Sequence, residues 1–146
     1  MIILKVYFSH PTFTYRTKTE ERCIEIIKKA FGKDYKAVKV INPSTFGFSI
    51  NPVKKIKKAD KIVGMAVSDE LLYLVWKELE LAEKFDVDQY IFYVESKDSL
   101  GPLVEGVPDS LTKLSKEESK VVSHRALKDQ KESFISMIVG NWGGRF

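Results

Sequence analysis

Residues 69–85 read DELLYLVWKELELAEKF, and this stretch decides how we expect the chain to fold. Its apolar residues recur at the spacing of a helix with one buried face, through Leu71, Leu72, Val75, Leu79 and Ala82. Glu78 lies beside that stripe, because the residues three, four and seven positions away from it are all apolar. An unpaired buried carboxylate costs several kcal/mol, so Glu78 is the first candidate functional residue.

Short apolar runs of strand length lie on both sides of this helix. KIVGMAV (residues 61–67) precedes it and QYIFYV (residues 89–94) follows it, while IILKVYFS (residues 2–9) and KAVKVI (residues 36–41) lie nearer the N-terminus. Near-continuous apolar runs of this length are typical of strands that are covered on both faces. The sequence therefore predicts four buried strands.

Capping signals predict two further helices between these strands. Thr17 and Glu20 have the spacing of a capping box, and a helical stripe follows as far as Gly32, through Cys23, Ile26, Ile27 and Ala30. The Asn51-Pro52 pair looks like an N-cap followed by proline at the first position of a short helix.

The C-terminal part is expected to contain a loop and then a helix. Residues 97–112 hold several glycine and proline breakers and are expected to form the loop. Ser115 and Glu118 make a second capping box, and the polar residues 128–132 predict a bend or break in the helix that it opens. The tail GNWGGRF (residues 140–146) is too rich in glycine to continue the helix.

The order of elements is strand, helix, strand, short helix, strand, helix, strand. For 146 residues, this alternation predicts a single α/β domain in which helices cover both faces of a mostly parallel sheet. Ligands bind such sheets at the carboxyl ends of the strands. Those ends are polar or turn-forming here, at residues 9–11, 42–44, 68–69 and 95–96, which predicts one cleft.

Composition limits the compartment and the partners. Cys23 is the one cysteine, so it has no internal disulfide partner, which suits a reducing cytosol. No apolar run approaches the ~18 residues of a membrane span and no signal peptide is visible, so we expect a cytoplasmic protein without a membrane partner. The net charge is +4, but the lysine cluster at residues 54–58 is more typical of a solvated helix face than of a nucleic-acid site.

Several common catalytic motifs are missing from the sequence. It contains no GxGxxG after the first strand, no GxxxxGK[ST] and no GxSxG. His10 and His124, the two histidines, are too far apart for a zinc motif. We therefore expect neither a metal ion nor a cofactor.

The motifs that remain carry a resemblance to a known family. They are YFSHP (residues 7–11), Phe13, Pro43, the Ala59-Asp60 pair before the third strand, and Glu78 four residues before Ala82. On these motifs, residues 6–94 of the chain resemble the nucleoside 2-deoxyribosyltransferase-like family. The resemblance implies a flavodoxin-like or Rossmann-like fold, a single-domain three-layer α/β sandwich with a central, mostly parallel sheet of four or five strands.

The resemblance also implies a chemistry. Glu78 would attack the anomeric carbon of a nucleoside or nucleotide, Asp69 would protonate the departing base, and Tyr7 would hold the Glu78 carboxylate through its hydroxyl. The residues implied in substrate binding, the phenylalanines by stacking on the base, are Ser9, His10, Phe13, Ser44, Phe46 and Phe48. A homo-oligomer is implied as well, since members of the family commonly complete each site from a neighbouring subunit.

Each of these residues also has a purely structural interpretation. Glu78 can be a helix acid bonded to a tyrosine or to a backbone amide, Tyr7 a packing residue and His10 a turn residue. Asp69 can belong to a helix cap, and the phenylalanines around Gly47 can close the core or an interface.

Three functions therefore stay open. The first is an N-glycosidic hydrolase or transferase without metal or cofactor, and the second is a non-catalytic nucleotide-binding or sensing module on the same fold. The third is a homo-oligomeric structural protein that associates through the aromatic loop and the tail. The chain departs from the family pattern at His10, where a glycine is usual, and at Leu74-Val75, where a Gly-Thr pair is usual.

Overall fold

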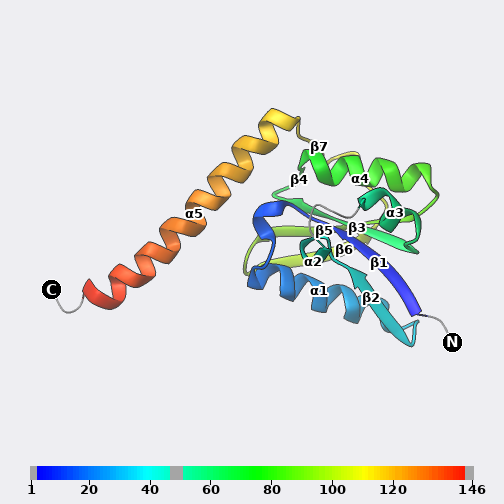
Figure 1. Cartoon of the computed structure of the whole chain (residues 1–146), viewed down its shortest axis with the longest axis horizontal. Helices are drawn as coiled ribbons and strands as arrows, with labels where there is room; N and C mark the ends of the chain where they lie inside the picture. The colour runs from blue at the N-terminus through cyan, green and yellow to red at the C-terminus, as the bar shows by residue number, and fades with distance from the viewer. Residues whose placement is uncertain (1–2, 47–50, 144–146) are drawn as a thin grey trace.

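A central sheet flanked by helices forms the body of the protein (Figure 1). The structure is a computed structural model that describes the backbone of residues 3–46 and 51–143, with side chains as far as residue 130. Five strands have five or more residues each: β1 (Ile3–Ser9), β2 (Ala37–Ile41), β3 (Lys61–Val67), β5 (Asp88–Ser96) and β6 (Ser99–Glu105). The four strands predicted from the sequence are present within two residues of their expected bounds.

The sheet is mostly parallel. β1 pairs in parallel with both β2 and β3, β3 pairs in parallel with β5, and β6 is antiparallel to β5 at the edge. The short strand β4 (Glu70–Leu71) turns back on the end of β3, and β7 (Thr112–Lys113) pairs in parallel with β4. This arrangement confirms the predicted mixed α/β class, with two short strands beyond the four or five expected.

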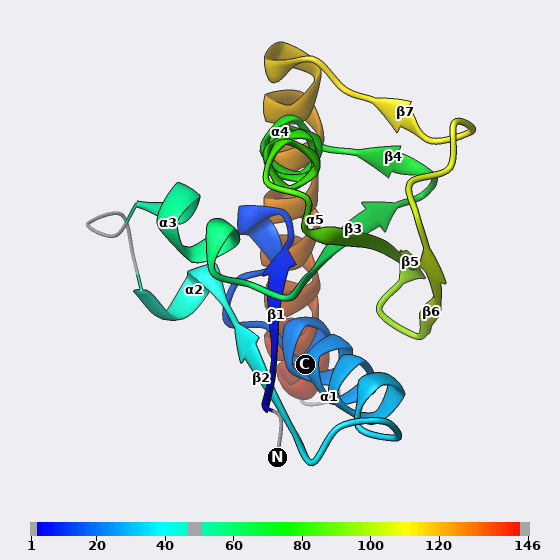
Figure 2. The same ribbon diagram turned by 90° about the vertical axis from the view of Figure 1, so that its right-hand side faces the viewer.

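Helices cover both faces of the sheet (Figure 2). On one face α1 (Lys18–Phe31) packs against Val6, Phe8 and Met65. On the other face α3 (Pro52–Lys57) and α4 (Tyr73–Lys84) pack around Tyr7 and Ile62. These right-handed crossovers bring the carboxyl ends of β1 and β3 to the same end of the sheet.

The approach of α4 to the sheet depends on a glycine. A Cβ atom placed on Gly64 in β3 would lie only 2.8 Å from Cδ1 of Leu79 in α4. The absence of a side chain at Gly64 therefore lets α4 pack closely on the strand that precedes it.

The helix predicted over residues 69–85 begins four residues late. Ser68 and Asp69 have positive φ angles of 48° and 61°, and they form a turn that folds β4 back on β3, with Val67 opposite Glu70. α4 therefore begins at Tyr73, and its backbone N–H is capped by the hydroxyl of Ser119 at 2.8 Å. The alternative of a helix cap at Ser68 and Asp69 is therefore wrong.

Other differences from the sequence-based prediction lie in the later part of the chain. Residues 97–112, expected to be a loop, contain β6 and begin β7. Pro102 is compatible with β6 because this strand lies at the sheet edge, where a missing N–H is tolerated. Where the sequence predicts the aromatic loop, over residues 44–50, residues 44–46 belong instead to the one-turn helix α2 (Pro43–Phe46), and residues 47–50 lie outside the described part.

The helix stripe of α1 is only partly as predicted. Cys23 and Ile27 are buried, but Ile26 and Ala30 are exposed, and Glu20 and Phe31 complete the buried face instead. The spacing of three or four residues between successive buried positions explains this face.

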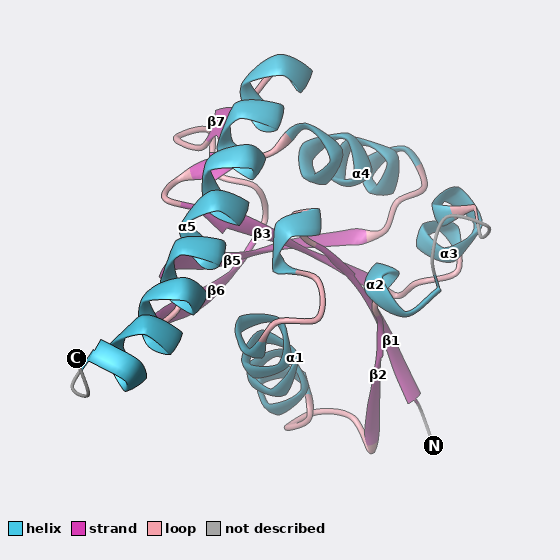
Figure 3. Cartoon of the chain, turned by 60° about the vertical axis from the view of Figure 1, so that its left-hand side comes forward, coloured by secondary structure: helices cyan, strands magenta, loops and turns pink. Residues whose placement is uncertain are grey.

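The last helix, α5 (Lys116–Gly143), extends past the rest of the chain (Figure 3). Ser115 and Glu118 form the predicted capping box, with reciprocal bonds of 3.1 and 2.9 Å. No bend or break ends the helix at residues 128–132, and it continues into the glycine-rich tail, of which residues 144–146 lie outside the described part. None of the described helices is both long enough and apolar enough to cross a membrane.

Candidate active site

Glu78 is held by two hydroxyl groups at the carboxyl end of β1. Tyr7 and Ser9 are two residues apart on this strand, so their side chains point to the same face of the sheet, the face that α4 covers. The Tyr7 hydroxyl donates to Oε2 of Glu78 at 2.6 Å, and the Ser9 hydroxyl donates to Oε1 at 2.7 Å. The contact expected between Tyr7 and Glu78 is therefore present, and Ser9, expected to contact substrate, is a second donor to the carboxylate.

Burial and hydrogen bonding act in opposite directions on this carboxyl group. Desolvation raises the pKa of Glu78, and the bonds from Tyr7 and Ser9 lower it, with a net increase over its ordinary value. The pKa of Tyr7 is raised by burial and by the charge of Glu78. Tyr7 therefore stays protonated and keeps donating to Glu78 at neutral pH.

His10 is buried on the other side of the strand end. Its ring stacks on Phe8 with the centroids 4.3 Å apart, its Nε2 lies 2.9 Å from Oδ1 of Asn42, and its Nδ1 lies 2.7 Å from the hydroxyl of Thr14. The Asn42 oxygen also accepts the backbone N–H of Ser44, so it is an acceptor and the proton of His10 belongs on Nε2. The Thr14 hydroxyl donates its one proton to the carbonyl oxygen of Pro11 at 2.6 Å, so its oxygen faces Nδ1 of His10 as an acceptor.

Burial and polar contacts act in opposite directions on the pKa of His10. Burial lowers the pKa, whereas the bond to Asn42 and the charge of Glu20 raise it, and burial has the larger effect. His10 is therefore a rigid connection between the ends of β1 and β2, where Asn42 lies.

Glu20 is a second buried carboxylate near the end of β1, and the sequence did not single it out. The Thr17 hydroxyl accepts the backbone N–H of Glu20, as a capping box requires, but the Glu20 side chain turns inward. Its Oε1 accepts the Ser44 hydroxyl at 3.1 Å, and its Oε2 lies 3.5 Å from Nε2 of His10 without a hydrogen-bond partner. Its position on the buried stripe of α1 is the sequence signal that could have identified it.

Tyr15 is influenced by the charges of both carboxylates. Its ring packs edge-on against His10, with centroids 4.8 Å apart. Burial, followed by the charges of Glu78 and Glu20, raises the pKa of Tyr15 to about 12. Tyr15 is thus a protonated phenol close to both acids, and the sequence-based site did not include it.

The other predicted site residues are dispersed. Asp69 is exposed in the turn between β3 and β4, and the described hydrogen bonds of Glu78 include none from it. Ser44 belongs to the His10 and Glu20 cluster. Phe13 is half-buried in the short helical turn η1 (Thr12–Thr14), and Phe46 is half-buried against the core under α4. Phe48 lies outside the described residues.

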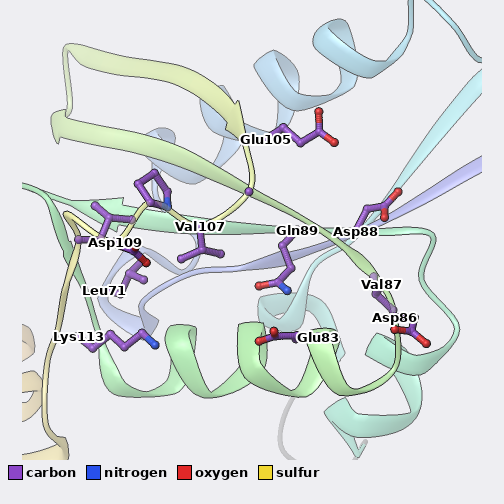
Figure 4. Close-up of a pocket in the computed structure, with 13 residues that line it drawn as sticks. Leu71, Glu83, Asp86, Val87, Asp88, Gln89, Glu105, Val107, Asp109 and Lys113 are labelled. Carbon is purple, nitrogen blue, oxygen red and sulfur yellow. The ribbon is translucent and has the colours of Figure 1, made fainter.

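The grooves on the surface of the described residues include one between β5 and β6 and one between α4 and α5. The β5–β6 groove, of about 920 Å³, is lined by acidic residues of α4, β5 and the segment after β6, including Glu83, Asp88 and Asp109 (Figure 4). The α4–α5 groove, of about 500 Å³, lies between η1, the start of α4 and the first half of α5. Val75, one helical turn before Glu78, lines the α4–α5 groove, so this is the groove adjacent to the candidate site.

Within the described residues, no group of three or more His, Cys, Asp or Glu side chains is arranged to hold a metal ion. Comparisons of the chain with protein-family models, with curated proteins and with solved structures give no match. The family resemblance and the chemistry that it implies therefore stay predictions, and the argument for function comes from the site itself.

Proposed function

We propose that the protein hydrolyses or transfers the N-glycosidic bond of a nucleoside or nucleotide, with Glu78 as the nucleophile. The observation that supports this proposal is the Glu78 carboxylate, largely buried yet oriented by the hydroxyls of Tyr7 and Ser9 at the carboxyl end of a central strand. Ligands of open α/β sheets bind at that end. Carboxylates with a raised pKa occur more often at functional sites than at positions that only pack the core.

The proposed reaction has two steps. Glu78 attacks the anomeric carbon, the glycosidic bond breaks, and its electron pair leaves with the base, which takes a proton from solvent. A glycosyl ester of Glu78 results. Water or a second base then attacks the same carbon and releases the Glu78 carboxylate. Tyr7 and Ser9 hold the carboxylate in one orientation, which aligns one oxygen with the reacting carbon.

The first test is release of free base from a panel of nucleosides and nucleoside 5′-monophosphates. Wild-type protein is expected to release base, and Glu78→Gln, which keeps the shape of the side chain but is a poor nucleophile, is expected to release none. Glu80→Gln is the matched control, because Glu80 is an exposed acid on the same helix. Equal release by wild type and Glu78→Gln would refute the proposed role of Glu78.

A nucleotide-binding or sensing module without catalysis is the second candidate. It is favoured by the exposed position of Asp69, which leaves the Glu78 cluster without the acid expected from the sequence. Nucleotide binding that is equally tight in wild type and Glu78→Gln, with no base released by either, would support this second function. The proposed homo-oligomer is tested separately, by light scattering of the purified chain.

A further inference from the structure

We propose that the α4–α5 groove binds the phosphate of the substrate, so that the natural ligand is a nucleoside monophosphate. This inference rests on the proposed function and adds the substrate class to it. It is carried by one juxtaposition: three basic residues of α5 line a groove whose wall includes Val75, one helical turn before Glu78, and no carboxylate of the described residues lines it.

The charge of the groove is one-sided. Lys116, Lys120 and His124 are four residues apart, so they lie along the same face of α5, and all three line the groove. The positive charges of Lys116 and Lys120 at this spacing repel one another, and a bound anion would reduce that repulsion. The β5–β6 groove is the opposite case, because several carboxylates line it (Figure 4). An anionic ligand is therefore directed to the α4–α5 groove.

The rest of the lining suits an ester rather than a bare ion. Leu72 and Val75 form an apolar wall from α4, and the hydroxyl-bearing residues Thr12 and Ser123 face the same space. A volume of about 500 Å³ falls within the range of small-molecule sites. Mixed apolar, hydroxyl and cationic lining matches a phosphate ester that carries an organic group.

The groove has fixed walls. The Ser119 hydroxyl accepts the backbone N–H of Tyr73 at 2.8 Å, and Nε1 of Trp76 donates to the carbonyl oxygen of Leu114 at 2.7 Å. These bonds join the start of α4 to the start of α5. The lysines of α5 are therefore presented to the groove by a helix that is anchored to α4.

Two segments of the chain that carry residues of the candidate active site also contribute residues to the wall of the groove. Val75 precedes Glu78 by three residues on α4, a rise of about 4.5 Å along the helix axis. Pro11, which lines the groove, follows Ser9 by two residues at the end of β1. A nucleotide with its anomeric carbon at Glu78 can thus extend its phosphate toward α5.

Calorimetric titration tests this inference without relying on turnover. Glu78→Gln protein would be titrated, in phosphate-free buffer, with the common nucleoside 5′-monophosphates and with the matching nucleosides. Lys116→Gln/Lys120→Gln would then be compared with Lys54→Gln/Lys58→Gln, which removes two exposed charges from the region of α3, outside the groove. Thermal unfolding of each variant checks that it is folded.

The groove variant is expected to bind the monophosphate about tenfold more weakly, because two charge-assisted contacts are lost. The control variant is expected to change the affinity by no more than about twofold, since its charges are screened over distance. The inference is overturned if both double variants weaken binding equally, if no monophosphate binds, or if the nucleoside binds as tightly as its monophosphate.

The base-release assay separates this inference from the proposed function. Monophosphate binding that depends on Lys116 and Lys120, without any base release by wild type, supports the groove and refutes the enzyme. Base release from nucleosides and monophosphates with the same kcat/KM, unaffected by the groove variant, supports the enzyme and refutes the groove.

Discussion

Removing one hydroxyl from the core tests how the Glu78 carboxylate is stabilised. Tyr7→Phe keeps the buried ring and deletes the 2.6 Å bond to Glu78. With Glu78 ionised, at a pH above its raised pKa, the lost bond is to a charged group and should cost about 1.5–3 kcal/mol of unfolding free energy. With Glu78 protonated the lost bond is to a neutral group, and the cost should fall to about 0.5–1.5 kcal/mol.

The sign of the pH dependence follows from the raised pKa of Glu78. A carboxyl group with a raised pKa in the folded state stabilises the fold fully below its ordinary pKa, and that stability is lost as pH rises through the folded value. Tyr7→Phe removes a bond that lowers the pKa of Glu78, so the variant's pKa is higher still and its loss with rising pH is larger.

Urea denaturation of wild type and Tyr7→Phe at about pH 9 and about pH 4 measures this difference, because about pH 4 lies below the raised pKa of Glu78. Tyr93→Phe is the matched control, because Tyr93 is half-buried and its hydroxyl makes no hydrogen bond among those described. A cost of Tyr7→Phe that equals that of Tyr93→Phe, or that is the same at both pH values, would refute the account of Glu78.

Three other predictions follow from single contacts. Burial lowers the pKa of His10, so the wild type loses stability as pH falls through about 6.5, and His10→Gln should lack this loss when the two are unfolded in urea at a series of pH values. Gly64→Ala should lower the unfolding free energy by about 1–3 kcal/mol, because its Cβ would meet Leu79 at 2.8 Å; a neutral result would mean that α4 can shift. Asp69→Asn should change stability by no more than about 0.5 kcal/mol, since Asn tolerates the positive φ there. Base release should also persist in Asp69→Asn. If this variant releases no base, Asp69 is the acid that protonates the departing base.

The strands and helices that have a regular apolar pattern or a capping residue could be predicted from the sequence. The four predicted strands each have an apolar run, although β2, at the sheet edge, has no fully buried residue, and α1 and α3 begin directly after the capping residues Thr17 and Asn51. The start of α4 could not be predicted in this way. It depends on a turn of two non-glycine residues, Ser68 and Asp69, and on a two-residue strand, and neither produces a periodic pattern.

The two buried carboxylates show why one site residue was predictable and the other was not. Glu78 conflicts with its own helix, because its neighbours at helical spacing are all apolar, and this conflict is visible in the sequence. Glu20 lies on the buried stripe of α1 with Cys23 and Ile27, but a capping box gives it a competing explanation until its side chain is seen to contact Ser44 and His10. Those partners come from other elements, so only the tertiary structure reveals them.

The alternation of side chains along β1 explains how both acids are held. Tyr7 and Ser9 point to one face of the sheet, toward Glu78. Phe8 points to the opposite face, the side of α1, where the His10 ring stacks on it near Glu20. A shift of β1 by one residue would reverse these faces and remove the donors of Glu78, so the register of one strand determines the chemistry available on both sides of the sheet.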